Sequence, residues 1–160
     1  MNTIIIRELD GIDIPDNAFM LDLRTREIKD CAGCWACWMK TPGRCAHKDM
    51  DDFYTAFLQA DKAMFFISVS CDFVSGRLKT LFDRLIPILL PYTSWKTGES
   101  IHDPRYERYP DIEVYYQGSF SSEEARNLYE EYVNRVFYQF HCKTIAIEPL
   151  GEYIRGGMAI

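Results

Sequence analysis

The sequence lacks the features that mark several large classes of protein. It has no basic stripe, and its 24 acidic residues outnumber 18 Lys and Arg to give a net charge of -6, so we expect no nucleic acid partner. No segment approaches the ~20 apolar residues of a membrane span, and the opening MNTIIIRELDGID has too short an apolar run for a signal peptide. We therefore expect a cytoplasmic protein that does not bind a membrane.

Motifs of hydrolases and of nucleotide-binding loops are also missing. The sequence has no G-x-S-x-G elbow and no Walker loop. Its three histidines, His47, His102 and His141, stand in no recognisable triad context. Hydrolytic chemistry therefore has little support in this sequence.

The residues that are present suffice for one packed domain. A chain of 160 residues, 48% hydrophobic and 14% aromatic, is the right size for a single domain over residues 1–160. Five short runs are rich in β-branched or aromatic residues and predict strands at Thr3–Leu9, Ala18–Leu23, Lys62–Ser68, Ile112–Gly118 and Lys143–Pro149. Consecutive apolar residues, such as Met64 to Ile67, indicate strands that are buried on both faces, as in a parallel sheet.

Helical patterns lie between these strands. Apolar residues from Ala125 to Phe140 follow an i, i+3, i+4, i+7 series after the capping residues Ser121 and Ser122. Two further helices are predicted, from an Asp49 N-cap to Ala60 and over Leu78–Leu85 before Pro87. The alternation of strands and helices predicts an α/β fold with an open, doubly wound sheet.

Four of the six cysteines fall within fifteen residues, Cys31, Cys34, Cys37 and Cys45, at the spacing C-x2-C-x2-C-x7-C. A reducing compartment disfavours disulfides, and a run of x2 spacings favours a 4Fe-4S cluster over structural zinc. The alternative is a loop packed by tryptophans with its thiols free. We expect the four thiols to converge near the carboxyl edge of the sheet.

Two cysteines lie outside this loop. We interpret Cys71 and Cys142 as buried small hydrophobic residues.

Several stretches together resemble one known family. The cysteine loop within Ile28–Met50, ADKAMFFIS (Ala60–Ser68), VSGRLKTLFDR (Val74–Arg84), and the later LIPILLPY and GESIHDPRYERYP resemble the flavodoxin-like NAD(P)H-dependent FMN reductases and, within them, the iron-sulfur flavoproteins. The resemblance implies a flavodoxin-like three-layer fold with a five-stranded, mostly parallel sheet. It also implies FMN at the carboxyl ends of the strands, NAD(P)H as substrate, electron transfer to a small-molecule or protein acceptor, and a 4Fe-4S cluster on the four cysteines close to the flavin.

The FMN site implied by the resemblance draws on two loops. Its candidate residues are Ser68, Ser70, Ser75, Lys79, Gly118 and Ser119. Two departures stand against it. Residues 9–17, LDGIDIPDN, replace the family's phosphate-binding loop and first helix, and their Asp10, Asp13 and Asp16 would repel a phosphate. Ser68 and Ser70 also stand where the family has proline and an aromatic ring. The alternative function is a non-catalytic flavodoxin-fold partner or binding protein that has lost FMN.

The predicted helices leave one face of the sheet with little cover, because the first and last helices are reduced or absent. Thr3–Arg7, Ala63–Ile67 and Thr144–Ile147 are apolar at both parities. We therefore expect a twofold homodimer through the uncovered sheet face.

Two further features each allow two interpretations. The irregular segment Pro91–Asp111 carries a cationic, aromatic patch, composed of His102, Arg105, Tyr106, Arg108 and Tyr109, that suits either a dinucleotide or a protein interface. Asp83 and Arg84 match the DR pair of the family. Adjacent helix positions do not face one another, so we favour separate capping or surface pairs over a joint role.

Overall fold

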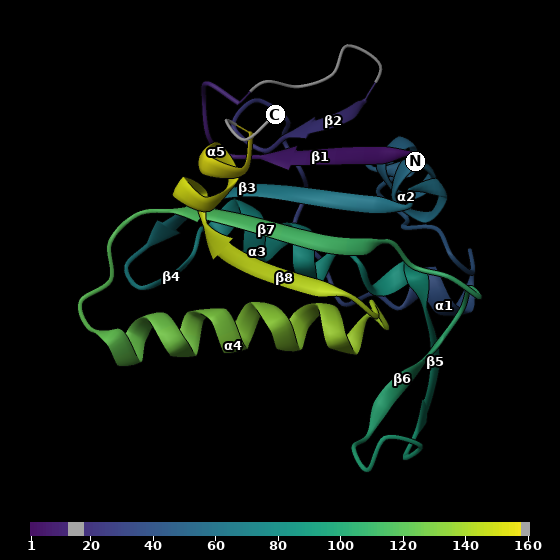
Figure 1. Cartoon of the computed structure of the whole chain (residues 1–160). Coiled ribbons are helices and arrows are strands. Elements are labelled where there is room, and N and C mark those ends of the chain that lie inside the picture. Colours follow the sequence, from purple (N-terminus) through teal and green to yellow (C-terminus); the bar gives the residue numbers. More distant parts are fainter. Residues whose placement is uncertain (13–17, 158–160) are drawn as a thin grey trace.

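The computed structural model describes residues 1–12 and 18–157. Its main sheet contains five parallel strands in the order β2-β1-β3-β7-β8, with the short β4 pairing antiparallel to β3 (Figure 1). The strand bounds are β1 Thr3–Arg7, β2 Phe19–Asp22, β3 Lys62–Ser70, β4 Phe73–Val74, β7 Asp111–Gln117 and β8 Ile145–Pro149. The order is that of flavodoxin-like doubly wound sheets, and the predicted α/β three-layer fold is confirmed.

The helices fill the connections between these strands. Their bounds are α1 Ala36–Met39, α2 Asp51–Gln59, α3 Gly76–Asp83, the 3-10 turn η1 Ile86–Ile88, α4 Glu123–Gln139 and α5 Leu150–Gly157. Ser122 caps α4 by accepting a hydrogen bond from Ala125 N, as predicted. The prediction of Asp49 as the cap of α2 is wrong: the N-cap is Met50, and the Asp49 carboxylate binds Arg84 instead.

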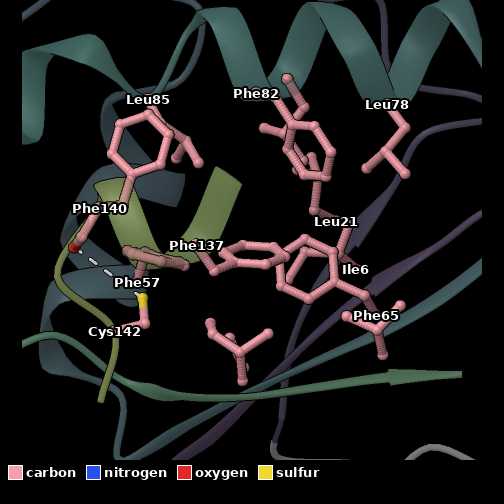
Figure 2. Packing of buried hydrophobic residues seen from close by; sticks show 14 of the residues in the cluster. Ile6, Leu21, Phe57, Phe65, Leu78, Phe82, Leu85, Phe137, Phe140 and Cys142 are labelled. Atoms are coloured by element: carbon pink, nitrogen blue, oxygen red, sulfur yellow. Dashed lines mark hydrogen bonds between the residues drawn. The ribbon is translucent and has the colours of Figure 1, made fainter. Parts of the chain in front are cut away.

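One face of the sheet is apolar throughout and carries the main core. Its residues alternate along the strands, so Ile4 and Ile6 of β1 lie in register with Ala63 and Phe65 of β3. Helices α2, α3 and α4 cover this face. Figure 2 shows Phe137 of α4 among these side chains, with its ring centroid 4.9 Å from that of Phe65.

The opposite face of the sheet is less apolar than the sequence pattern predicted. Its central residues Ile5 and Phe66 are apolar, but Arg7–Asp22 and Lys62–Glu113 ion pairs lie on the same face. The apolar centre is therefore smaller than the sequence pattern predicts.

Helix α5, reduced to 8 residues as expected, lies on this second face (Figure 1). The Tyr153 ring packs 4.9 Å from Phe66 and 5.0 Å from Tyr115 between centroids. Leu150 joins the same cluster. The C-terminal segment thus covers the apolar centre of a face that we expected to find largely bare.

The segment predicted to be irregular contains a hairpin. Strands β5 Leu89–Ser94 and β6 Ile101–Pro104 pair antiparallel and project from the body of the molecule (Figure 1). Its turn uses Gly98 at φ 83°, a backbone conformation that favours glycine. Tyr92 and Trp95 are 68% and 72% exposed near the tip, and an isolated two-stranded hairpin is marginal in water.

Cys71 and Cys142 have different environments. Cys142 is buried as predicted, but Cys71 is exposed, at φ 51° in the turn between β3 and β4. A tight turn needs both Cys71 and Asp72 in the left-handed region, and this places the Cys71 side chain outside the core. Among the described helices, none is long and apolar enough to cross a membrane.

Candidate functional site

The carboxyl edge of the sheet is organised around Glu8, which directly follows β1. Its Oε2 accepts hydrogen bonds from the backbone N (3.0 Å) and Oγ (3.1 Å) of Ser68, and its Oε1 accepts one from Ser75 Oγ. The same Ser75 Oγ accepts a hydrogen bond from Leu78 N at 3.0 Å and so caps α3. Glu8 therefore places a carboxylate beside the N-terminus of α3, where a helix favours negative charge.

A pocket of about 520 Å³ opens at this edge. It is lined by Glu8, Arg24, Ser68, Ser75, Gly76 and Arg77. Arg24 is already bound to Asp22 and Asp10, and hydrogen bonds from Arg24 hold the pKa of Asp22 far below its ordinary value. Arg77 donates from Nη1 to the backbone oxygen of Arg24 at 3.0 Å. Both arginines of this pocket are therefore already bound within the chain, Arg24 to two carboxylates and Arg77 to a backbone carbonyl.

Of the six residues predicted for FMN, only Ser68 and Ser75 line this pocket. Ser70 and Ser119 are exposed elsewhere on the surface, and Lys79 forms an ion pair with Asp83. Gly118 adopts φ 147°, and a Cβ there would lie 2.7 Å from Val69 Cβ, so its role is close packing against β3.

The residues at this edge do not fit the phosphate of FMN. Residues 8–12 and 18 form no helix between β1 and β2, while Asp13 and Asp16 lie outside the described residues. The Glu8 carboxylate accepts the hydrogen bonds of Ser68 and Ser75 that a phosphate would need. A phosphate bound beside Glu8 would also be repelled by its negative charge. Sequence reasoning missed Glu8, although its position one residue after a buried strand could have marked it.

A second pocket, of about 200 Å³, is lined by all four clustered cysteines, Cys31, Cys34, Cys37 and Cys45. The other lining residues include Trp35, Trp38, His47, Asp83, Arg84 and Pro87. The four cysteines therefore border one shared pocket, and the prediction that their thiols converge on a cluster stays a prediction. Trp35 and Trp38 line the same pocket, so the alternative of a loop packed by tryptophans with free thiols also stays open.

The position of this pocket corrects the prediction that it lies at the carboxyl edge. Ser75 caps the start of α3 at that edge, whereas the pocket is lined by Asp83, Arg84 and Pro87 beyond the other end of the helix. Figure 1 shows α1 on the side where β1 begins. A helix of 8 residues spans about 12 Å, so α3 separates the cysteines from the edge pocket.

Tight turns shape the cysteine loop. Gly33 and Gly43 have φ of 60° and 82°, and Trp35 also adopts a left-handed conformation at φ 59°. Gly43 N donates to Cys37 O at 3.0 Å, and a Cβ at Gly43 would lie 3.1 Å from Tyr106 Oη. Glycine is therefore needed at position 43 both for backbone conformation and for space.

Trp38 attaches the loop to the base of the β5–β6 hairpin. Its Nε1 donates to Leu89 O at 3.1 Å, and its ring lies 4.9 Å from that of His102 between centroids. Trp35 remains 63% exposed. One tryptophan thus anchors the loop and the other lies on its surface.

The thiol of the half-buried Cys37 has a raised pKa. Burial raises the pKa of Cys37, and the neighbouring charges of Cys45, Cys31 and Cys34 raise it further. Ionising several of these thiols therefore requires a compensating positive charge, which a metal centre supplies.

Cysteine thiolates are ligands both for structural zinc and for iron-sulfur clusters. Among residues 1–12 and 18–157, no three His, Cys, Asp or Glu side chains form a group that could hold one metal ion. A cubane binds each thiolate at a separate iron corner, so its ligands surround a volume and need not meet at a point. The four cysteines line one small pocket, and soft thiolates are the ligands that such clusters take.

Arg84 closes the inner side of this pocket, and sequence reasoning undervalued it. Its side chain is buried, only 2% of the residue is exposed, and it forms an ion pair with Asp49. The hydrogen bond from Arg84 lowers the pKa of Asp49 from 3.8 to about 2, although burial opposes this. Asp83 pairs with Lys79 on the surface. Asp83 and Arg84 therefore form separate pairs, as predicted, and Arg84 is the C-cap of α3.

The predicted cationic, aromatic patch serves mainly to attach the hairpin. Arg105 donates from Nε to Pro87 O and from Nη2 to Leu89 O, both at 3.1 Å. Tyr109 Oη donates to Ile88 O at 2.7 Å, His102 Nδ1 lies 2.9 Å from Leu90 O, and Arg108 binds Asp61. His102, Arg105 and Tyr109 thus satisfy the carbonyls of residues 87–90, which gives these three residues a structural role.

Comparison with known proteins adds no assignment. No protein-family model matches the chain, and no curated protein matches it.

Proposed function

We propose that this protein is an electron-transfer protein of flavodoxin-like fold that carries a 4Fe-4S cluster on Cys31, Cys34, Cys37 and Cys45. The single observation that carries this proposal is that all four thiols line one pocket of about 200 Å³. The four cysteines would hold the cluster, which would supply single-electron transfer to a small-molecule or protein partner.

The residues around the pocket suit that role. Trp38 fixes the loop by donating to Leu89 O, so the ligand-bearing backbone is tied to a second element. Cys37 and Cys45 are half-buried, whereas Cys31 and Cys34 are exposed. The inner thiols are therefore shielded from water, while the outer two lie on the side from which a redox partner approaches.

Flavin-dependent NAD(P)H oxidation is the second candidate. The observation that favours it is the pocket of about 520 Å³ at the carboxyl edge, because doubly wound sheets bind ligands at that edge. Glu8 stands against FMN there, so we derive no step through a flavin. The same carboxylate favours the alternative of a flavodoxin-fold partner that has lost FMN.

One experiment separates these candidates. The protein is purified without oxygen, reconstituted with iron and sulfide, and analysed for iron, acid-labile sulfide and absorption, followed by titration with FMN. We expect cubane stoichiometry and no FMN binding at micromolar concentrations. Bound FMN would favour the flavoprotein, and protein without iron after reconstitution would contradict the proposed function.

A further inference from the structure

The guanidinium of Arg84 has a donor that the protein does not use. Nη1 donates to Lys29 O and, at 3.2 Å, to Asp49 Oδ2, while Nη2 donates to Asp49 Oδ1. The buried Nε has no hydrogen-bond partner among the described residues. Buried charged donors are nearly always paired, so this nitrogen calls for an acceptor that the chain itself does not provide.

The surroundings hold Arg84 in place. Its residue ends α3 as the C-cap, its carbonyl oxygen accepts a hydrogen bond from Tyr54 Oη at 2.5 Å, and Asp49 is fixed in turn by Lys29 N at 3.0 Å. Arg84 lines the same pocket as the four cysteines. A fixed cation therefore borders the space between the thiols.

Charge around Arg84 is consistent with this location. Burial opposes a high pKa of Arg84, but its hydrogen bonds to the Asp49 carboxylate raise that pKa above its ordinary value. Cys45 lines the same pocket as Arg84.

We propose that Arg84 is a positioning residue that raises the reduction potential of the cluster by donating its Nε-H to a cluster sulfur or to Cys45 Sγ. This inference rests on the proposed function. An added electron makes the cluster more negative, and a nearby donor and cation stabilise that reduced form. Asp49 lowers the reduction potential, because its negative charge partly cancels the positive charge of the guanidinium that it binds.

The test compares reduction potentials of variants with opposite predicted shifts. Arg84→Lys keeps a cation for Asp49 but lacks the Nε-H, and Asp49→Asn keeps the donor but removes the opposing charge. Arg77→Lys, on the exposed surface at the other end of α3, and Asp52→Asn, in an exposed pair with Arg26, serve as matched controls. Each potential is measured by spectroelectrochemical titration of the reconstituted protein, with circular dichroism as the check on folding.

We expect Arg84→Lys to disfavour reduction at least tenfold, which corresponds to about 59 mV for one electron. Asp49→Asn shifts the potential upward, and both controls stay within threefold of the wild type. If Arg84→Lys is only less stable, with an unchanged potential, Arg84 is purely structural and the inference is wrong. If that variant loses its cluster, Asp49→Asn decides: an upward shift supports the inference and an unchanged potential overturns it. The iron content of the wild type distinguishes this failure from that of the proposed function, because a wild type without iron ends both.

Discussion

Glu8 places a negative charge at the carboxyl edge of the sheet. The carboxylate collects three hydrogen bonds from Ser68 and Ser75 and lies at the N-terminus of α3, where an anionic ligand would otherwise gain most. The edge therefore already contains its own anion. The hydroxyls of Ser68 and Ser75 and the N-terminus of α3 are therefore satisfied without a bound ligand.

The cysteine at position 45 provides the sharpest test of the proposed cluster. Cys45→Ser should abolish the iron-sulfur absorption and the bound iron, because serine is a far poorer ligand for iron in a cubane. The exposed Cys71 lies outside the pocket, so Cys71→Ser is the matched control and should keep its iron. Equal iron content in the two variants would show that Cys45 is not a ligand.

The pair formed by Asp49 and Arg84 predicts a pH dependence of stability. The Asp49 pKa falls from 3.8 to about 2 on folding, so its contribution is fully present above about pH 5 and is lost as the pH falls towards 2. The shift corresponds to about 2 kcal/mol.

Urea unfolding of the wild type at pH 5 and pH 3 measures this effect, with Asp49→Asn for comparison. The variant should lose less of its free energy of unfolding between these pH values than the wild type. Identical losses would show that Asp49 does not contribute through its charge.

At the scale of elements, α5 shows how tertiary packing overrides weak local propensity. Its sequence contains three glycines, Gly151, Gly156 and Gly157, and glycine in a helix costs roughly 1 kcal/mol each. The helix forms because Leu150 and Tyr153 cover Ile5 and Phe66 on the sheet. Burial of these side chains offsets the poor propensity.

Tyr153→Ala tests that account. Removing the ring that packs on Phe66 and Tyr115 should lower the free energy of unfolding by about 2 kcal/mol. Ile154→Ala on the same helix is the control, because Ile154 is 47% exposed, and should change it by less than about 0.5 kcal/mol. Chemical denaturation measures both, and equal losses would mean that α5 is not held by its Tyr153 face.

The sequence was sufficient to predict the elements with strong periodicity and insufficient for those decided by distant contacts. The five main strands and helix α4 follow from apolar patterns that are local. The cap of α2 was mispredicted because the Asp49 carboxylate gains more from a buried arginine 35 residues away than from a helix terminus. The spacing of the four cysteines indicated that they would lie near one another. It could not indicate the edge of the sheet at which they lie, because this depends on the path of residues 24–30 alongside α3.

At the scale of the whole molecule, the two pockets lie at opposite ends of α3. Ser75 begins the helix beside Glu8, and Arg84 ends it beside the cysteines. Helix α3 therefore extends from the edge where such folds bind ligands to the pocket of the proposed redox centre.

We propose that the molecule is a twofold homodimer, and the structure narrows where its interface can lie. Helix α5 covers the apolar centre of the second sheet face, and ion pairs occupy much of the remainder. Met20, 40% exposed, is an apolar residue on the part of that face away from α5. The projecting hairpin, with Tyr92 and Trp95 exposed, adds a second apolar surface that closed pairing would bury.

Light scattering at low micromolar concentration should therefore give twice the chain mass of 18.7 kDa. Charged substitutions locate the contact, because a lysine at a dimer interface is desolvated without a partner. Met20→Lys should shift the protein towards monomer if the bare part of the sheet face is the interface, and Tyr92→Lys combined with Trp95→Lys should do so if the hairpin contributes. Lys substitution of exposed Leu128 on α4 is the control and should leave the dimer intact. A wild type that scatters as a stable monomer would refute the dimer, whatever the variants do.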